Sequence, residues 1–435
     1  LNHSGGTITF QTGTLVASNG TGLQFNNADG IYNFNGTSTL NGGDAGIDIV
    51  NGSVGTFGFG ASTAITHAAA GDAFVLTDSN ADVTYSGSIT DSNGYAIRID
   101  NHDAGAITFQ TGNIGANGAG ALGLSVINSN GGAVNFNGAI ALNTGANTAI
   151  TLDSNAGGTV SFSAAGDGLD IVTTSGTGLL ISGGGTVNVL GANNSITSTS
   201  GTLLNVSNAT AGATTLTLNF GAASNTSGAN GILISRTAGT LTGSVNIAGG
   251  AITATNRGVD LDGDALTFAY GGSITTSGAT ARSVEVTNRT ANLATFLGNI
   301  TDNALGINIA NNTGGTVSFS GPSIALSTVA NATALTLANN TGTSILFGMA
   351  GGGNGLDILA SGTGTGISFT GGGLLAIGGT GNTVQTATGQ ILNLVNGNVS
   401  AAGLTFDSLT STGTVAATAI NVSNVDGGTL NGGTV

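Results

Sequence analysis

The chain has 435 residues, of which 79 are Gly and 1 is Pro, with no Cys, Trp or Lys, and its formal net charge is -15. The lack of Cys excludes disulfides and Cys-based zinc sites, and an acidic chain without Lys is unsuited to binding nucleic acid. Collagen is excluded because Gly has no three-residue period, and simple disorder is disfavoured because 39% of the residues are hydrophobic.

The first residues, LNHSGGTITFQTG, lack the basic and apolar stretches of a signal peptide. No apolar run is long enough for a transmembrane helix, so we expect that the chain does not span a membrane. Because the sequence starts and stops within a repeating pattern, we interpret it as a mature fragment or as a segment of something longer.

The strongest pattern is an aromatic position that recurs every 24 to 27 residues along the first part of the chain. The series consists of Phe10, Phe34, Phe59, Tyr85, Phe109, Phe136, Phe162, Val189, Phe220, Ile247, Phe268, Phe296, Phe319, Phe347, Ile377 and Phe406. A period of roughly 26 residues gives about 16 units and indicates a solenoid, since a propeller blade needs ~40–45 residues.

Each unit predicts three short strands separated by turns. The first strand alternates apolar and polar residues, as at 22–25, 46–49, 96–99, 123–126, 149–152, 258–261, 283–286, 306–309 and 334–337. The second ends on the aromatic position, as at 7–10, 106–109, 133–136, 159–162 and 316–319, and the third is short, as at 87–89, 138–140 and 298–300. Alternation places successive side chains on opposite faces of a strand.

These features predict an all-β fold, a right-handed parallel β-helix (β-solenoid) that runs continuously over residues 1–435. It would have about 16 coils of roughly 26 residues, with three short strands per coil. The right hand follows from the preferred crossover between parallel strands. Coils ~4.8 Å apart would make a rod of roughly 80 Å.

Stacked coils place equivalent residues on top of one another. We therefore predict an internal aromatic stack that includes Phe10, Phe34, Phe59, Phe109, Phe136, Phe162, Phe319 and Phe347. We also predict a ladder of side-chain amides at one bend, because Asn tolerates a left-handed backbone. Its members are Asn27, Asn51, Asn101, Asn128, Asn288, Asn311 and Asn339.

The coils also belong to a longer duplication of about 185 residues, in which 122–206 matches 305–394 in order. The blocks GLDIVTTSGTGLLISGGGTVNVL and GLDILASGTGTGISFTGGGLLAI are the clearest of these matches. They resemble the β-strand repeats of very large secreted bacterial surface proteins, of the filamentous-haemagglutinin-like or autotransporter adhesin type. This resemblance implies secretion, a right-handed parallel β-helix, and a stalk or adhesive role.

One group of charged residues is a candidate catalytic site. Asp260 and Glu285 hold equivalent outward positions in adjacent coils, so they should lie ~5 Å apart, a spacing that suits a retaining glycosidase. Asp262 and Asp264 follow at alternating positions, and four of the five arginines lie nearby: Arg236, Arg257, Arg282 and Arg289. The alternative that we favour is a surface cluster of salt bridges.

Calcium is the one cofactor for which the sequence offers candidates. GGNGLDILA at 352–360, with Asp357, fits the calcium-binding β-roll pattern once. DLDGD at 260–264, with Asp262 and Asp264, resembles only the start of an EF-hand loop. The alternative is Gly-rich turn chemistry with solvated acids, and the three His residues do not cluster in the sequence.

The sequence therefore favours a secreted, extracellular or cell-surface structural protein, a stalk, fibre or adhesive segment that is not an enzyme. Its expected partners are copies of itself, neighbouring segments of a longer chain, and glycans or surfaces. Two alternatives remain: a polysaccharide lyase or glycoside hydrolase that uses the acids around 260–285, and a glycan-binding module without catalysis.

Overall fold

The computed structural model describes residues 3–41, 45–164, 166, 168–191, 193–208, 212–329, 331–348, 355–414 and 418–433. These residues form strands and no helix. The predicted all-β class is confirmed: the chain is a parallel β-solenoid of about 16 turns of about 26 residues, with three parallel sheets. Two compact units are distinguished, Leu1–Gly221 with Thr237–Leu241, and Ala222–Arg236 with Thr242–Val435.

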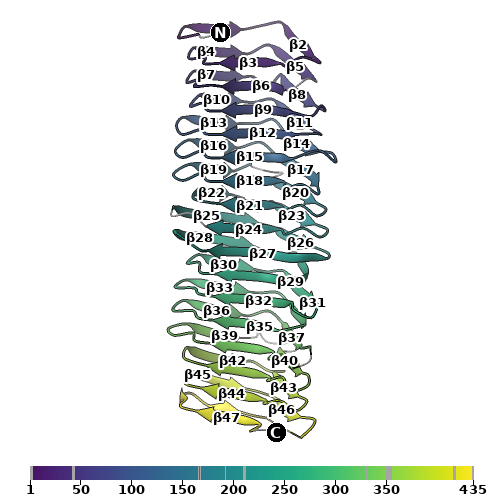
Figure 1. Ribbon diagram of the computed structural model, residues 1–435, viewed down its shortest axis with the longest axis vertical. Helices are drawn as coiled ribbons and strands as arrows, with labels where there is room; N and C mark the ends of the chain where they lie inside the picture. Colours follow the sequence, from purple (N-terminus) through teal and green to yellow (C-terminus); the bar gives the residue numbers. More distant parts are fainter. Residues whose placement is uncertain are drawn as a thin grey trace. The chain divides into compact units, whose positions relative to one another are not determined.

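In the first unit, one sheet holds the aromatic strands and is called the aromatic sheet. Its strands are β1 (Thr7–Phe10), β4 (Ile31–Phe34), β7 (Thr56–Phe59), β10 (Asp82–Tyr85), β13 (Ala106–Phe109), β16 (Ala133–Phe136), β19 (Thr159–Phe162), β22 (Gly185–Val189) and β25 (Ala213–Phe220). Neighbouring strands pair in parallel, and Figure 1 shows β4, β7, β10 and β13 one above another.

Two further sheets complete each turn of this unit. The second sheet holds β2 (Thr14–Ser18), β5 (Thr37–Asn41), β8 (Thr63–His67), β11 (Ser88–Asp91), β14 (Ile114–Asn117), β17 (Ile140–Gly145), β20 (Leu169–Thr173) and β23 (Ser195–Ser198). The third sheet holds β3 (Leu23–Asn26), β6 (Ala45–Val50), β9 (Asp72–Thr77), β12 (Tyr95–Asp100), β15 (Gly123–Ile127), β18 (Ile150–Asp153), β21 (Leu179–Ser182) and β24 (Leu204–Asn208).

The other unit repeats this plan. Its aromatic sheet holds β28 (Thr240–Ile247, mostly in this unit), β30 (Thr267–Tyr270), β33 (Leu293–Phe296), β36 (Thr316–Phe319), β39 (Ser344–Gly348), β42 (Leu374–Gly378), β45 (Asn398–Thr405), β48 (Asp426–Gly427) and β49 (Leu430–Asn431). Along the second face lie β26 (Ala222–Asn225), β31 (Ser273–Ser277), β34 (Ile300–Asn303), β37 (Ser323–Ser327), β40 (Gly355–Ala360), β43 (Thr383–Thr386) and β46 (Ser408–Ser411).

The third face of this unit carries β27 (Gly228–Arg236), β29 (Ala251–Asp262), β32 (Arg282–Thr287), β35 (Ile307–Ala310), β38 (Leu335–Ala338), β41 (Ile367–Thr370), β44 (Leu392–Val395) and β47 (Ile420–Ser423). Strand β29 is longer than the others and serves two faces. Its first residues pair with β31 and its last residues pair with β32. The corner that separates two strands in other turns is therefore part of one strand here.

The predicted aromatic stack is present inside the solenoid. The rings of Phe109, Phe136 and Phe162 stack with centroid distances of 5.1 and 4.9 Å, and the rings of Phe319 and Phe347 lie 4.7 Å apart. Phe34 and Phe59 also stack and are buried, as is the stacked pair Phe296 and Phe319. Phe10 stacks on Phe34 but is 46% exposed, because no described strand covers its other face.

Three members of the predicted series were assigned two residues away from the observed column. The register partner of Val189 is Leu218 instead of Phe220, that of Ile247 is Tyr270 instead of Phe268, and that of Ile377 is Leu404 instead of Phe406. In each case two inward residues that lie two positions apart are both apolar, with Phe406 directly after the end of β45, so the aromatic ring alone did not identify the register. The three Phe side chains are nevertheless buried.

Candidate functional site

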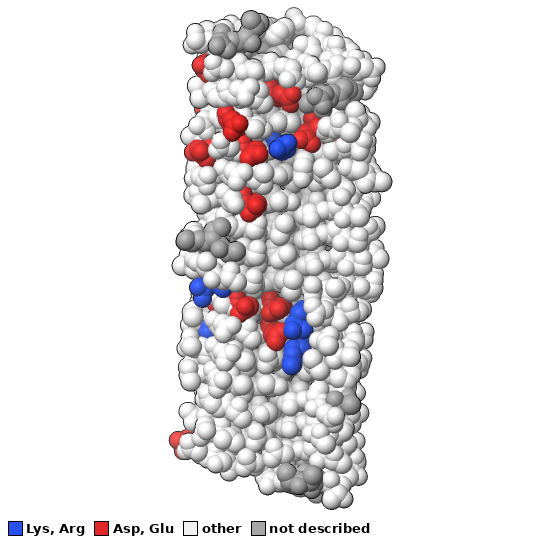
Figure 2. Space-filling view, in the orientation of Figure 1, with Lys and Arg blue, Asp and Glu red and all other residues white. Residues whose placement is uncertain are grey.

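The carboxylates of Asp260 and Glu285 lie on the outward side of the third face, on adjacent strands. Asp260 pairs in register with Glu285, and Arg257 pairs with Arg282 in the same two strands, β29 and β32. The structure therefore brings together two of the four predicted acids with two arginines. Figure 2 shows acidic and arginine side chains side by side on a surface that is otherwise mostly uncharged.

Arg257 connects the two carboxylates. Its Nε lies 2.5 Å from Oε2 of Glu285 and 4.0 Å from Oδ2 of Asp260. The other oxygen of Glu285 accepts a hydrogen bond of 2.8 Å from Nδ2 of Asn308 and lies 3.8 Å from Nε of Arg282. Both carboxylate oxygens of Glu285 therefore contact a donor, whereas, among the described residues, the carboxylate of Asp260 has only the more distant guanidinium of Arg257 beside it. This arrangement matches the alternative of a surface cluster of salt bridges.

The two carboxyl groups differ in their surroundings. Burial raises the pKa of Asp260 to about 6, the negative charge of Glu285 adds to this rise, and Arg257 opposes it. On the preceding turn, the register partner of Asp260 is Leu233, whose side chain has no polar group that could bind the carboxylate of Asp260. A carboxyl group with a raised pKa beside a second carboxyl group is an arrangement that acid–base chemistry uses.

The other two predicted acids do not join this pair. Asp262 accepts hydrogen bonds from Thr287 Oγ1, at 3.0 Å, and from Asn288 Nδ2, at 2.7 Å. Asp264 is fully buried and forms an ion pair with Arg289, which is also buried. The interpretation of Asp264 as a surface catalytic or calcium-binding acid is therefore wrong, because the turn directs its side chain inward.

Asp357, the remaining calcium candidate, lies on the outward side of β40. Its Oδ1 accepts a hydrogen bond of 2.5 Å from Oγ1 of Thr383 on the next turn. Residues 352–354 of the calcium pattern lie outside the described residues. In the part of the chain that the structure describes, no three His, Asp or Glu side chains lie close enough together to hold a metal ion.

The predicted Asn column has the expected backbone, but its amides form few ladder bonds. All seven predicted residues have positive φ, from 50° at Asn27 to 58° at Asn101 and Asn311. Only the Asn311–Asn339 pair among them has an amide-to-amide hydrogen bond in the described residues, at 3.3 Å. Asn101, Asn128 and Asn288 donate to acids of the preceding turn instead. These side chains are mostly exposed, so solvent and acids compete for them.

A buried polar column, which the sequence did not reveal, lies directly after these left-handed residues. In the first unit it contains Ser79, His102, Ser129 and Asn155, and Asn155 Oδ1 accepts from the backbone N–H of Ser129 at 2.9 Å. In the other unit, Asn312 Nδ2 donates to Asn340 Oδ1 at 2.8 Å. These groups satisfy the backbone at a bend where no strand partner is available.

Two histidines are buried. His67 Nδ1 lies 2.9 Å from Oδ2 of Asp91, and both side chains are at most 1% exposed. His102 Nδ1 lies 2.8 Å from the carbonyl oxygen of Ser79, while its Nε2 has no hydrogen-bond partner. The sequence did contain a sign of the His67–Asp91 pair. Both residues stand at positions of β8 and β11 where the alternation predicts an inward, apolar side chain.

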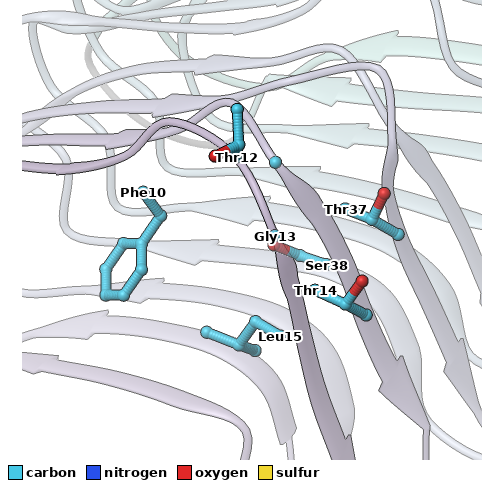
Figure 3. Close-up of a pocket in the computed structure, with 8 residues that line it drawn as sticks. Phe10, Thr12, Gly13, Thr14, Leu15, Thr37 and Ser38 are labelled. Carbon is cyan, nitrogen blue, oxygen red and sulfur yellow. The ribbon is translucent and has the colours of Figure 1, made fainter.

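The first described turn contains a cavity of about 250 Å³. Figure 3 shows its lining by Phe10 of β1, Thr14 and Leu15 of β2, and Thr37 and Ser38 of β5. The cavity has no acid, base or cation in its lining. It is an uncovered part of the interior and offers no chemistry of its own.

The fold defines the class of the protein as a parallel β-solenoid. No protein-family model matches the chain, and no curated protein and no solved structure matches it. In the described residues, no helix is long and apolar enough to cross a membrane.

Proposed function

We propose that the chain serves outside the cell as a structural or adhesive β-solenoid, a segment of a stalk or fibre. The observation that carries this proposal is the in-register pairing of each turn with the next within each unit. For example, Phe109, Phe136 and Phe162 follow one another in one column. Within each unit, the described turns are thus held by backbone hydrogen bonds and by an apolar interior, which suits a load-bearing element.

The outward surface supports an adhesive role. Only 6% of the residues are charged, and the outward columns consist largely of Thr, Ser and Asn. Such side chains give weak hydrogen-bonded contacts that gain strength when many of them act together along one axis. We propose copies of the same chain, neighbouring repeats, and glycans or surfaces as the partners.

Electron microscopy of the purified chain without added ligand tests the structural role. Long fibres with a ~4.8 Å axial repeat are expected if turns of different copies stack end to end. Discrete particles at all concentrations would contradict filament formation, and adhesion to glycan-coated beads then tests the adhesive role by itself.

A second candidate function is polysaccharide degradation at Asp260 and Glu285, which the raised pKa of Asp260 favours. In this reading Asp260 donates its proton to the glycosidic oxygen as the bond from that oxygen to the anomeric carbon breaks, and the carboxylate of Glu285 attacks that carbon. Water then hydrolyses the glycosyl ester, with Asp260 taking the proton of the water. The ion pair between Arg257 and Glu285 disfavours the enzymatic function, because the guanidinium already binds the carboxylate that would have to react. Loss of hydrolysis in Asp260→Asn would support the enzyme, and absence of hydrolysis of any glycan by the unmodified chain would eliminate it.

A further inference from the structure

A hollow of about 320 Å³ lies on the outward side of β40, β43 and β46 in the second unit. Six outward side chains line it in two columns of three. Asp357, Thr383 and Ser408 form one column, and Leu359, Gln385 and Thr410 form the other. The volume is at the lower end of the range in which proteins hold small ligands.

The lining combines three kinds of group. Asp357 supplies a carboxylate whose Oδ1 is already fixed by Thr383 Oγ1, and the hydroxyls of Ser408 and Thr410 lie 2.9 Å apart. The amide of Gln385 has no hydrogen-bond partner among the described residues, so both its donor and its acceptor are available to a ligand. Leu359 is 46% exposed and adds an apolar contact.

We propose that this hollow binds a neutral, extended polysaccharide. Neighbouring hydroxyls of a sugar donate to a carboxylate and exchange hydrogen bonds with an amide, while the C–H face of the ring packs on an aliphatic side chain. The inference rests on the proposed adhesive role and names its ligand and its site.

The surface around the hollow determines that the ligand is a polymer. The outward column that contains Asp357 continues over earlier turns with Ala325, which lies next to Asp357, and then with Thr301, Thr275 and Thr253. Turns lie ~4.8 Å apart, which is close to the length of one sugar in an extended glycan. A chain that lies parallel to the solenoid axis therefore meets about one side chain per sugar, which is a hydroxyl at three of the four earlier turns and the methyl group of Ala325 at the fourth.

The negative charge of the hollow and of the whole chain favours a polysaccharide without acidic groups. The hollow holds one carboxylate and no cation, and the whole chain has a formal charge of -15. Uronates and sulfated glycans would be repelled. Because no aromatic side chain lines the hollow, each contact is weak, and affinity grows with the number of turns engaged.

Affinity electrophoresis in native gels tests the proposal, with barley β-glucan as the neutral probe, polygalacturonate as the acidic probe, and EDTA throughout. The unmodified chain should be retarded by β-glucan and not by polygalacturonate. The double variant Asp357→Ala/Gln385→Ala should lose at least about tenfold in retardation, because two hydrogen-bonding groups are removed. All replaced residues are exposed, and circular dichroism checks that the variant is folded.

The matched control is Asp170→Ala. Asp170 is an outward acid of β20 in the other unit, and its Oδ1 accepts a hydrogen bond from Ser195 Oγ as Asp357 accepts from Thr383. The control should bind like the unmodified chain. The proposal is overturned if β-glucan does not retard the unmodified chain, if polygalacturonate retards it more, or if the double variant is retarded equally. None of these outcomes affects fibre formation, so the structural role is judged separately by microscopy.

Discussion

Arg289 and Asp264 form an ion pair between two consecutive turns, and their side chains are 1% and 0% exposed. Arg289 also donates through Nη2 to the carbonyl oxygen of Leu266, at 2.8 Å. It stands in the buried polar column that contains Asn312 and Asn340, and its backbone N–H donates to Oδ1 of Asn312 at 2.8 Å. At this position of the column the chain has the guanidinium of Arg289 where later turns have the side-chain amides of Asn312 and Asn340, and the buried charge is paired with Asp264.

Asp264→Ala is expected to lower the free energy of unfolding by about 3–5 kcal/mol, because it leaves the buried guanidinium of Arg289 without its counter-charge. Urea unfolding followed by circular dichroism measures the loss. Arg98→Ala is the control, since Arg98 is 41% exposed and lies 3.7 Å from Asp72, and it should cost at most about 1 kcal/mol. Equal losses in the two variants would contradict the importance of the buried pair.

Gly132→Ala should destabilise the first unit through a contact with His102. A methyl group on Gly132 would clash with Cδ2 and Nε2 of the His102 ring and would lie 2.9 Å from the backbone oxygen of His102, and such overpacking costs about 1–3 kcal/mol. His102→Ser, which matches Ser79 and Ser129 in the same column, should remove the part of this cost that comes from the ring and leave the part that comes from the backbone oxygen. A double-mutant cycle of urea midpoints tests the coupling, and strictly additive effects would show that the ring is not the obstacle.

Phe136→Ala is expected to destabilise the aromatic stack by about 3–5 kcal/mol, because it leaves a cavity between two rings. Phe136 lies between Phe109 and Phe162 and is fully buried. Phe10→Ala removes the same side chain from a position that is 46% exposed and has one stacking partner. Thermal unfolding should therefore be shifted clearly less by Phe10→Ala, and a similar shift would argue against stacking within the core.

The pKa of Asp260 predicts a pH dependence of stability. Its pKa rises from 3.8 to about 6 in the fold, so between these values the folded chain retains a proton that the unfolded chain has released. The free energy of unfolding should fall as the pH rises through this window, and the contribution is lost above it. Asp260→Asn should flatten this part of the curve.

Asp170→Asn, at an outward acid that is not among the charges that shift the pKa of Asp260, serves as the control for this measurement and should leave that slope in place. Burial also raises the pKa of Asp91 and Asp264. The comparison is therefore between variants at each pH, and an identical slope in Asp260→Asn and the unmodified chain would contradict the assignment.

Much of the local structure followed from alternation. The predicted strands at 133–136, 159–162 and 316–319 coincide with β16, β19 and β36. The left-handed Asn positions were also predicted, because few side chains tolerate positive φ. The errors occurred where one strand has two apolar inward residues, as at Phe268 and Tyr270, since alternation does not say which of them continues the column.

The candidate site was predicted only in part. The outward pairing of Asp260 with Glu285 followed from equivalent positions in adjacent units. The inward direction of Asp264 did not, because it depends on the path of a Gly-containing turn and on Arg289, which lies 25 residues later. The buried His67 and Asp91 were also missed, because an inward polar residue is stable only when the next turn supplies its partner.

The sequence by itself determined the period, the three strands per turn and the side chains that form the interior, because alternation and repetition are local properties that stacking merely extends. Only the tertiary structure decided which polar groups are buried together and where Asp357, Gln385 and Thr410 come to line one hollow. Those outcomes depend on the register between turns, and register is set by contacts between residues about one period apart.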